Sequence, residues 1–458
     1  MLRKIIVVKK REPLEEAWRA RSFSIAKPLL EDTLRPEGFA IDESLPPVQL
    51  KGKGPMLEAN PTALGFDYKD LNKPRDLSLF SIRANFEDKQ QVENLLQKQL
   101  DEVVGVFADP TITAISSPTY CDPRGSETPV GDFKTVAKKL GTGSLKLTGK
   151  GVRVAIVDTG IDSSGIGITV DGGWAPPGVN YQPGRAPSGH GTMCAYDAHI
   201  SAPNAKMLDY GLLQSRAGPT FNAFLSDAIA AFADLIDLLE REPGPLVVNN
   251  SWGLYDRSED DPIGSPGNYS ANLNHPFNQI VGSLVAAGAD VLFAAGNCGA
   301  DCPDDRCGTN DMGPGKSIHG ANSHPDVITV AAITVDGRRL GYSSQGPGGL
   351  YQRKPDIAAY SHFKGSGVYP ADGGTSAASP VAAGVIAALR EKFSNTVVST
   401  ARLKGTIQRT AIDVNNNGWD YDLGYGIINP TNALNAFRQP IRVRRPTRRT
   451  TRTRKRRS

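Results

Sequence analysis

Four short segments of this 458-residue chain decide its fold, although they are widely separated along it. In chain order they are Val154-Ala-Ile-Val-Asp158-Thr-Gly160, Ser188-Gly-His190-Gly-Thr192, Ala294-Ala-Gly-Asn297 and Gly374-Thr-Ser376-Ala-Ala-Ser-Pro380. The first and third are apolar runs that end in a polar side chain, a pattern typical of a buried strand followed by a loop. The last opens an alanine-rich run that predicts a helix.

Strand and helix patterns alternate from residue 152 onward, which predicts an α/β fold with a mostly parallel central sheet and helices on both faces. The expected strands are 153–157, 206–208, 246–248, 291–295 and 327–331, and the expected helices are 220–239, 273–287 and 376–390. In such sheets the carboxyl ends of the strands form the active crevice. Asp158 and Asn297 both follow a strand end, so we expect them at one edge.

The residue types in these segments suit acyl transfer to a serine. A serine hydroxyl is a poor nucleophile near neutral pH and needs a base, for which imidazole is well suited. The imidazole needs a carboxylate that fixes its tautomer and stabilises its cation. A serine at the start of a helix also directs free N–H groups and a positive dipole end toward a developing oxyanion. We expect Thr375 to cap that helix.

In residues and in the chain order Asp, His, Ser, the four segments resemble the subtilisin-like serine proteases, the subtilases. The resemblance covers about residues 135–437 and implies a subtilisin-like peptidase domain. It implies that Ser376 is the nucleophile of a serine endopeptidase, that His190 is its base and that Asp158 orients the base. Asn297 is implied as the second oxyanion donor. An acyl-enzyme on the serine would be the intermediate.

The same resemblance implies where a protein or peptide substrate lies. Ser251-Trp252-Gly253 is similar to the family's edge segment, on which an extended substrate pairs through its backbone. The small residues Ala294, Ala295 and Gly296 would form a wall of the specificity pocket. No acidic residue is identifiable at the pocket floor, so no strict preference for basic side chains is expected.

An N-terminal region, residues 1–120, precedes the peptidase-like part, and 121–134 is expected to be a linker. Within this region about 76–117 predicts a small α+β unit. The pattern gives a strand over 76–84, a helix over 88–100 and strands over 103–107 and 112–115. The unit resembles the subtilase propeptide, which assists folding and blocks the cleft until it is cut. This implies a self-processing precursor, and a plain accessory domain is the alternative.

The formal net charge of +4 hides an asymmetry, because the tail 438–458 holds eleven Lys and Arg and no acid. The residues before it are therefore net acidic. The tail lacks apolar residues at helical spacing and is expected to be disordered. Two hypotheses stay open for it: a solubilising or expression-related tail, or an arm that binds an acidic partner or nucleic acid by counterion release.

Neither a secretory apolar region nor a transmembrane segment of about twenty apolar residues is visible, so the expectation is a cytoplasmic protein. Five cysteines cannot all pair with one another, and most are expected to be thiols. For Cys298, Cys302 and Cys307, loop thiols are favoured over a disulfide or a metal site. Cys194, one helical turn after the histidine, is expected to have a packing role.

No cofactor is expected to be required. Subtilases often bind structural calcium, but the usual ligands cannot be matched in this sequence. Residues 413–418 have the oxygen-rich start of a calcium loop and lack its bidentate Glu at position twelve, which favours a polar turn.

Two other functions are kept as alternatives. One is a non-hydrolytic scaffold or binding protein that docks on nucleic acid through its basic tail. The other is a subtilase that ligates peptides instead of hydrolysing them.

Overall fold

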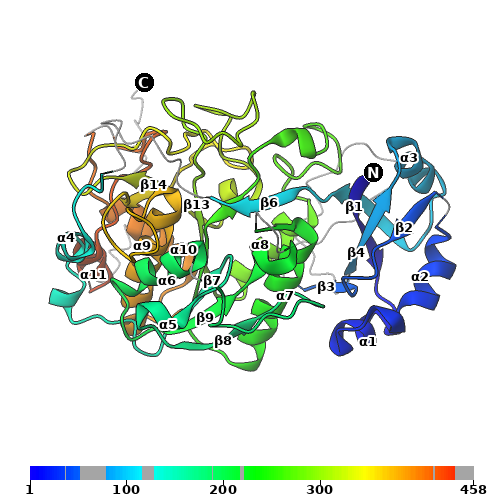
Figure 1. The fold of residues 1–458 in the computed structure, drawn as a ribbon, viewed down its shortest axis with the longest axis horizontal. Coiled ribbons are helices and arrows are strands. Elements are labelled where there is room, and N and C mark those ends of the chain that lie inside the picture. Colours follow the sequence, from blue (N-terminus) through cyan, green and yellow to red (C-terminus); the bar gives the residue numbers. More distant parts are fainter. Residues whose placement is uncertain are drawn as a thin grey trace, which may run out of the picture.

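The computed structural model describes residues 1–36, 38–51, 79–115, 128–187, 189–216, 221–415 and 418–438. Figure 1 shows a small N-terminal unit, in blue, packed against a larger unit that holds most of the chain. Strand β6 (Thr111–Ala114) leaves the small unit and runs across the larger one (Figure 1). No helix in these ranges is long and apolar enough to cross a membrane.

A seven-stranded sheet forms the centre of the larger unit, and each pair of neighbouring strands in it is parallel. The strand order is β15-β14-β13-β11-β7-β9-β8. The strands are β7 (Arg153–Val157), β8 (Val170–Trp174), β9 (Lys206–Tyr210), β11 (Leu246–Asn250), β13 (Asp290–Ala294), β14 (Ile328–Ile333) and β15 (Ile357–Tyr360). The five strands other than β8 and β9 are buried along their whole length, as a sheet covered on both faces requires.

Strand β7 shows how the two faces are buried. Side chains alternate along a strand, so Val154 and Ile156 enter one core while Ala155 and Val157 enter the other. Helices α6 and α9 cover the first core, and α7 and α8 cover the second. The helices of this unit are α4 (Phe133–Leu140), α5 (Ser163–Ile166), α6 (His190–His199), α7 (Leu225–Arg241), α8 (Pro276–Ala286), α9 (Gly374–Lys392), α10 (Thr400–Thr410) and α11 (Pro430–Arg438).

The predicted α/β class, with a mostly parallel sheet and helices on both faces, is confirmed. One predicted helix, 220–239, begins too early. Helix α7 starts at Leu225, because β10 (Asn222–Phe224) is a strand that pairs with β6. The partner strand lies more than a hundred residues earlier in the chain, so local periodicity could not reveal it.

The N-terminal unit is built around the first strand of the chain. Strand β1 pairs antiparallel with β4 on one side and with β5 on the other, so β4, α3 and β5 form a split βαβ unit around it. The elements are β1 (Leu2–Lys9), α1 (Glu12–Ala20), α2 (Lys27–Leu34), β2 (Phe39–Ile41), β3 (Val48–Leu50), β4 (Leu79–Phe86), α3 (Lys89–Gln97) and β5 (Val103–Ala108). The unit therefore extends well before the predicted 76–117, whose strand at 112–115 belongs to another sheet.

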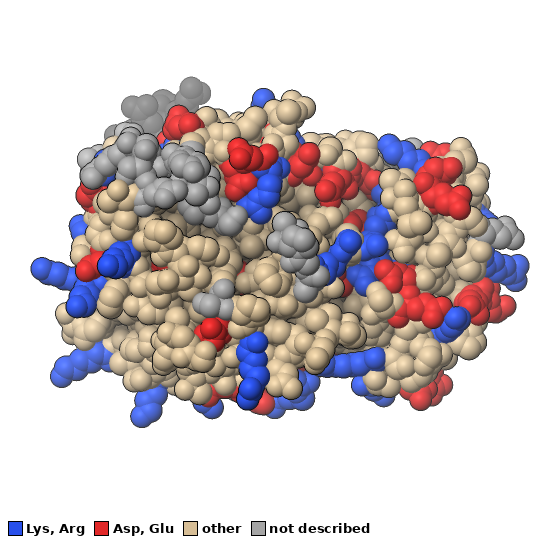
Figure 2. Space-filling view, viewed as in Figure 1, with Lys and Arg blue, Asp and Glu red and all other residues tan. Residues whose placement is uncertain are grey.

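Buried charges join the two units. Arg83 of β4 donates from Nη1 to Oδ1 of Asp227 in the first turn of α7 at 2.7 Å, and its Nε lies 3.0 Å from Oδ2 of Asp42. Asp109 accepts from the backbone N–H and the hydroxyl of Ser226 at the same helix start. A carboxylate there satisfies free N–H groups and meets the positive end of the helix dipole. Figure 2 shows acidic and basic side chains interspersed over the N-terminal unit.

Candidate active site

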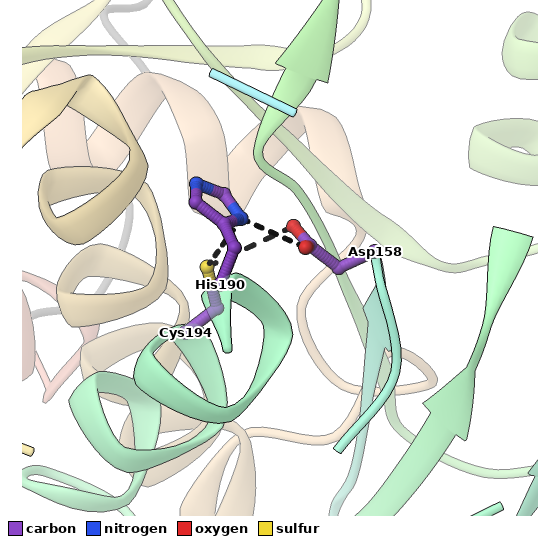
Figure 3. A group of neighbouring side chains, drawn as sticks. All are labelled: Asp158, His190 and Cys194. Carbon is purple, nitrogen blue, oxygen red and sulfur yellow. Dashed lines mark hydrogen bonds and ion pairs between the residues drawn. The ribbon is translucent and has the colours of Figure 1, made fainter. Parts of the chain in front are cut away.

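Two elements of the larger unit bring a carboxylate and an imidazole together. Asp158 follows β7, and His190 is the first residue of α6. Nδ1 of His190 lies 2.8 Å from Oδ1 of Asp158, and both side chains are buried (Figure 3). A Cβ added to Gly191 would lie 2.4 Å from the carbonyl oxygen of Gly160. Glycine is therefore needed for the helix to approach the loop that carries Asp158 so closely.

The surroundings of His190 favour its charged form. Burial alone would lower the pKa of the imidazole, but the charge and the hydrogen bond of Asp158 outweigh burial, and the pKa is raised. A second acceptor adds to the increase, because Nε2 lies 3.2 Å from the carbonyl oxygen of Ile115. Both ring nitrogens thus face oxygen acceptors.

Ser376 is the third residue of α9, which begins at Gly374 and is capped by Gly373. Gly374 has a φ of 72°, which a residue with a side chain adopts only with strain. Thr375 lies inside the helix, so its predicted role as the N-cap is wrong. Its hydroxyl instead accepts from the backbone N–H of Gly296 at 3.1 Å, which ties the helix start to the segment after β13.

That segment carries Asn297. The side-chain oxygen of Asn297 accepts from the backbone N–H and from the hydroxyl of Thr375, at 3.0 and 3.1 Å. Because Thr375 fixes the position of the side-chain oxygen of Asn297, the orientation of its amide nitrogen, which is a hydrogen-bond donor, is fixed as well. The residue is fully buried, and a φ of 108° at Gly296 makes the turn between β13 and the amide. The structure therefore gathers Asp158, His190, Ser376 and Asn297 at one site, and Asp158 and Asn297 both follow the carboxyl ends of strands, as expected from the sequence.

A strand from the N-terminal region occupies the crevice beside these residues. Strand β6 lies between β10 and β12 (Trp252–Gly253) and is antiparallel to both. The backbone N–H of Ile115, directly after β6, donates to the carbonyl oxygen of Ser251 at 2.8 Å. The predicted edge segment Ser251-Trp252-Gly253 thus pairs with a strand of the chain itself. This is the backbone pairing that an extended peptide would make.

Ile115 is placed at the centre of the site. Its carbonyl oxygen accepts from the hydroxyl of Ser376 and lies in reach of Nε2 of His190. Its side chain is 1% exposed and packs in one apolar cluster with Tyr255, Ala294 and Cys298. The further lining residues of this pocket are Gly253, Leu254, Ala295, Gly296, Asn297, Ser317, His319 and Asn322. None of the described lining residues is acidic, and Ala294, Ala295 and Gly296 lie where a pocket wall was predicted.

Comparison with known proteins shows the family of this chain. A model of the subtilase family matches residues 149–426, which is more than half of the chain. The chain belongs to the subtilase family. Subtilisin E of Bacillus subtilis is 26% identical over 347 residues, which cover 73% of this chain and 79% of subtilisin E. The subtilisin of Bacillus pumilus is 28% identical over 285 residues, 62% of this chain and 90% of that protein.

A longer relative, fervidolysin of Fervidobacterium pennivorans, is 26% identical over 324 residues. The match covers 63% of this chain but only 41% of fervidolysin. The crystal structure of fervidolysin, described as a keratinolytic enzyme related to subtilisin, superposes with a TM-score of 0.57 at 18% identity. That superposition covers 97% of this chain and 62% of the fervidolysin chain, and it shows that the fold is subtilisin-like. Membership of the family supports serine peptidase activity.

The cysteines of this subtilase differ from the prediction. Cys298 and Cys307 form a disulfide, with a Cα–Cα distance of 5.8 Å. Cys302 is disulfide-bonded as well, so the preference for loop thiols is wrong for all three cysteines. Sequence spacing could not decide it, because pairing depends on how the loop folds back. Cys194 is a buried free thiol whose Sγ lies 3.8 Å from Oδ2 of Asp158, and burial raises its pKa well above the usual range (Figure 3). A neutral, packed thiol fits the expected packing role.

Among the described residues, one group of three His, Cys, Asp or Glu side chains is close enough to hold a metal ion, and it is Asp158, His190 and Cys194. These residues are already engaged with one another at the site, so calcium ligands stay unassigned. In the turn after α10, Asp413 accepts from the backbone N–H of Gly418 at 2.8 Å, as expected of a polar turn.

A buried pair of carboxyl groups lies behind the loop that leads to the serine. Asp197 of α6, whose two carboxyl oxygens are buried without a hydrogen-bond partner, lies close enough to Asp372 for each acid to affect the pKa of the other, and Asp372 accepts from the hydroxyl of Ser366 at 2.7 Å. Burial, together with the neighbouring acid, raises the pKa of Asp197 well above its usual range, and burial also raises that of Asp372. Burial and the neighbouring acid therefore both favour the protonated form of Asp197.

Sequence reasoning missed three features of the site. Strand β10 forms the second wall of the crevice, and its three residues are too short for a periodic signal. Strand β6 was predicted as a strand, and the resemblance to a propeptide implied that its unit blocks the cleft, but the pattern did not single out β6 as the segment that lies there. Arg306 reaches the same strand from the disulfide loop, and nothing in its local sequence indicates this contact. Ser188 of the His190 segment and the tail after Arg438 lie outside the described residues.

Proposed function

We propose that this protein is a serine endopeptidase that works through Asp158, His190 and Ser376, with Asn297 as an oxyanion donor, and that it is made as a self-processing precursor. One observation carries the proposal. Ile115, the residue directly after β6, presents its peptide carbonyl to both the hydroxyl of Ser376 and the imidazole of His190. A peptide bond of the chain is therefore held where the nucleophile and the base meet.

The chemistry follows from these positions. In the present arrangement the carbonyl oxygen of Ile115 accepts hydrogen bonds from the site, so the carbonyl must turn toward Asn297 before attack. Ser376 Oγ then bonds to the carbonyl carbon while its proton passes to Nε2 of His190. Asp158 stabilises the imidazolium. The Asn297 amide and backbone N–H groups at the start of α9 donate hydrogen bonds to the negatively charged oxygen.

Collapse of the tetrahedral intermediate breaks the bond between Ile115 and Ser116. His190 returns its proton to the leaving amine, and the acyl group stays on Ser376. Water then attacks the ester with His190 as base, which releases the new carboxyl terminus and regenerates the hydroxyl. The N-terminal unit would remain bound as an inhibitor, because β6 keeps its pairing with β10 and β12 after the bond is cut.

The pocket around Ile115 defines the substrate class that we propose. The side chain of Ile115 packs in an apolar cluster, and the described lining residues, some of which are polar, include no carboxylate to pair with Lys or Arg. His319 in the lining is kept neutral, because burial and the nearby Arg257 lower its pKa. Proteins and peptides cut after a medium-sized aliphatic residue are therefore the expected substrates.

N-terminal sequencing and intact mass of the purified protein test this proposal. Wild type should yield a fragment that begins at Ser116, while Ser376→Ala should keep its full N-terminus. Ser379→Ala, three residues further along α9, is a matched control that should still be cut. A fluorophosphonate probe should label wild type and fail to label Ser376→Ala. Identical migration of wild type and Ser376→Ala, with no labelling of either, would contradict the proposal.

The alternatives, a scaffold and a peptide ligase, gain no support from the comparisons. The acidic or nucleic-acid partner of the basic tail concerns residues outside the described ranges and stays a prediction. The cytoplasmic localisation also stays a prediction. Disulfides such as Cys298–Cys307 persist mainly in oxidising compartments, which is an observation against it.

A further inference from the structure

The loop that follows Asn297 folds back over the bound strand. The disulfide between Cys298 and Cys307 closes it at its base. Within it, the backbone N–H of Asp304 donates to the carbonyl oxygen of Asn297 at 2.9 Å, and that of Cys307 donates to the carbonyl oxygen of Asp304 at 2.9 Å. The loop is thereby fixed to the residue proposed as the oxyanion donor.

Arg306 extends from this loop to the strand in the cleft. Its Nη1 donates to the carbonyl oxygen of Ala114 at 2.9 Å and to the hydroxyl of Thr113 at 3.3 Å. Ala114 and Thr113 are the second and third residues before the bond after Ile115. Strand β10 pairs with β6 only as far as Thr113. The guanidinium therefore binds the carbonyl group just beyond the point where strand pairing on that side ends.

The guanidinium is also held by two residues outside the strand, Asp304 and Tyr255. Its Nε and Nη2 donate to the two oxygens of Asp304, each at 2.9 Å, which is the bidentate geometry that fixes an arginine fork. Nη2 also donates to the hydroxyl of Tyr255 at 2.9 Å, and the guanidinium carbon lies 4.1 Å from the centre of that ring. Tyr255 is itself part of the pocket around Ile115.

We propose that Arg306 is a specificity-determining residue, which binds the backbone carbonyl of the second residue before the cleaved bond and selects a hydroxyl side chain at the third. This inference rests on the proposed peptidase function and adds to it. Pairing along β10 and β12 is indifferent to side chains, because it uses only the backbone. By contrast, the hydrogen bond from Arg306 to the hydroxyl of Thr113 depends on which side chain occupies that position. A threonine or serine at the third position satisfies it, whereas valine of the same shape does not.

Two peptide substrates test the proposal without changing the protein. Ile-Thr-Ala-Ile-p-nitroanilide repeats the residues that precede the proposed cleavage point, and Ile-Val-Ala-Ile-p-nitroanilide lacks only the hydroxyl. For the processed wild-type protein, kcat/KM should favour the threonine peptide by about 3- to 10-fold, as expected for one hydrogen bond to a partly exposed charged group. Equal kcat/KM values would overturn the proposal.

Substitution of the arginine isolates its contribution. In Arg306→Met the threonine preference should fall to about one. The valine peptide should lose about 10-fold in kcat/KM with the carbonyl contact, and the threonine peptide about 3- to 10-fold more with the hydroxyl contact, mostly through a higher KM. Arg338→Met is the matched control, because Arg338 also pairs with an aspartate two residues before it, Asp336, at 2.9 Å. It should keep the wild-type preference. If the threonine preference persists in Arg306→Met, Arg306 stabilises its own loop and does not select the substrate side chain.

Amide hydrogen exchange tests the contact without relying on catalysis, so that lost activity in a misfolded variant is not mistaken for a lost contact. In full-length Ser376→Ala, whose cleft keeps its own strand, amide hydrogen exchange of residues 111–115 should become several-fold faster when Arg306→Met is added. Unchanged exchange would contradict the contact. If wild type neither takes the fluorophosphonate label nor cuts either peptide, the peptidase proposal fails and this one with it. If it labels and cuts without a threonine preference, only the role of Arg306 is wrong.

Discussion

The pocket around Ile115 permits a quantitative prediction of cleavage preference. The side chain is 1% exposed, so nearly all of it leaves the solvent. Each buried methylene contributes about 0.8 kcal/mol. Replacing isoleucine by valine at the first position before the bond removes one such group, and replacing it by alanine removes three. The expected losses of transition-state binding are about 0.8 and about 2.4 kcal/mol, or about 4-fold and about 60-fold in kcat/KM.

A series of peptides Ile-Thr-Ala-Xaa-p-nitroanilide, with Xaa as Ile, Val, Ala, Phe and Lys, measures this preference on one protein. Phenylalanine should be cut more slowly than isoleucine, because Tyr255 and Cys298 pack against the Ile115 side chain and overpacking costs about 1–3 kcal/mol. Lysine should be poorest, since its ammonium would lose hydration without a carboxylate partner. If alanine is cut within about 3-fold of isoleucine, or if lysine is preferred, the assignment of this pocket is wrong.

Three other predictions follow from buried charges. Asp197→Asn should raise the melting temperature at pH 8 and flatten its pH dependence. The pKa values of Asp197 and Asp372 are raised on folding, so the stability that their protonated form provides is present at low pH and is lost as pH rises through the raised values. Arg83→Met should leave Asp227 buried without its partner, at a cost of about 3–5 kcal/mol. The N-terminal unit should then dissociate faster after cleavage, seen as a shorter lag before peptide hydrolysis, and an unchanged lag would refute the role of this pair. Self-cleavage should slow as pH falls through the pKa of His190, because only the neutral imidazole accepts a proton. The carbonyl of Ile115 in the cleft raises the pKa of His190. The rate of self-cleavage should therefore fall at a higher pH than the rate of peptide hydrolysis by the processed protein. If both rates fall at the same pH, this effect of the carbonyl is wrong.

The chemical groups proposed for the site could be singled out from the sequence because each one lies at a local structural signal. Asp158 and Asn297 end apolar runs, and Ser376 opens an alanine-rich helix. Such signals reflect burial and helix formation within a few residues, which are properties of a short segment. Thr375 shows the limit of this reasoning. Its type and place favoured an N-cap, but tertiary contacts with Gly296 and Asn297 put its hydroxyl to another use.

The N-terminal region shows the same division. Alternation and helical spacing predicted β4, α3 and β5, but not that β1, more than seventy residues earlier, is the strand between β4 and β5. Strand pairing across such a distance leaves little trace in either partner, because the hydrogen bonds use the backbone alone. The Cys298–Cys307 disulfide was misjudged for a similar reason, since its formation depends on the path of the loop.

By itself, then, the sequence determined the α/β class, the family resemblance and the four polar groups proposed for catalysis, since local patterns encode each of them. Only the tertiary structure decided that residues 111–115 lie in the cleft, that Ile115 fills an apolar pocket and that Arg306 reaches the strand from a disulfide-closed loop. These contacts join segments that are distant in the chain. Their geometry arises when the two units pack together, and no single segment carries it.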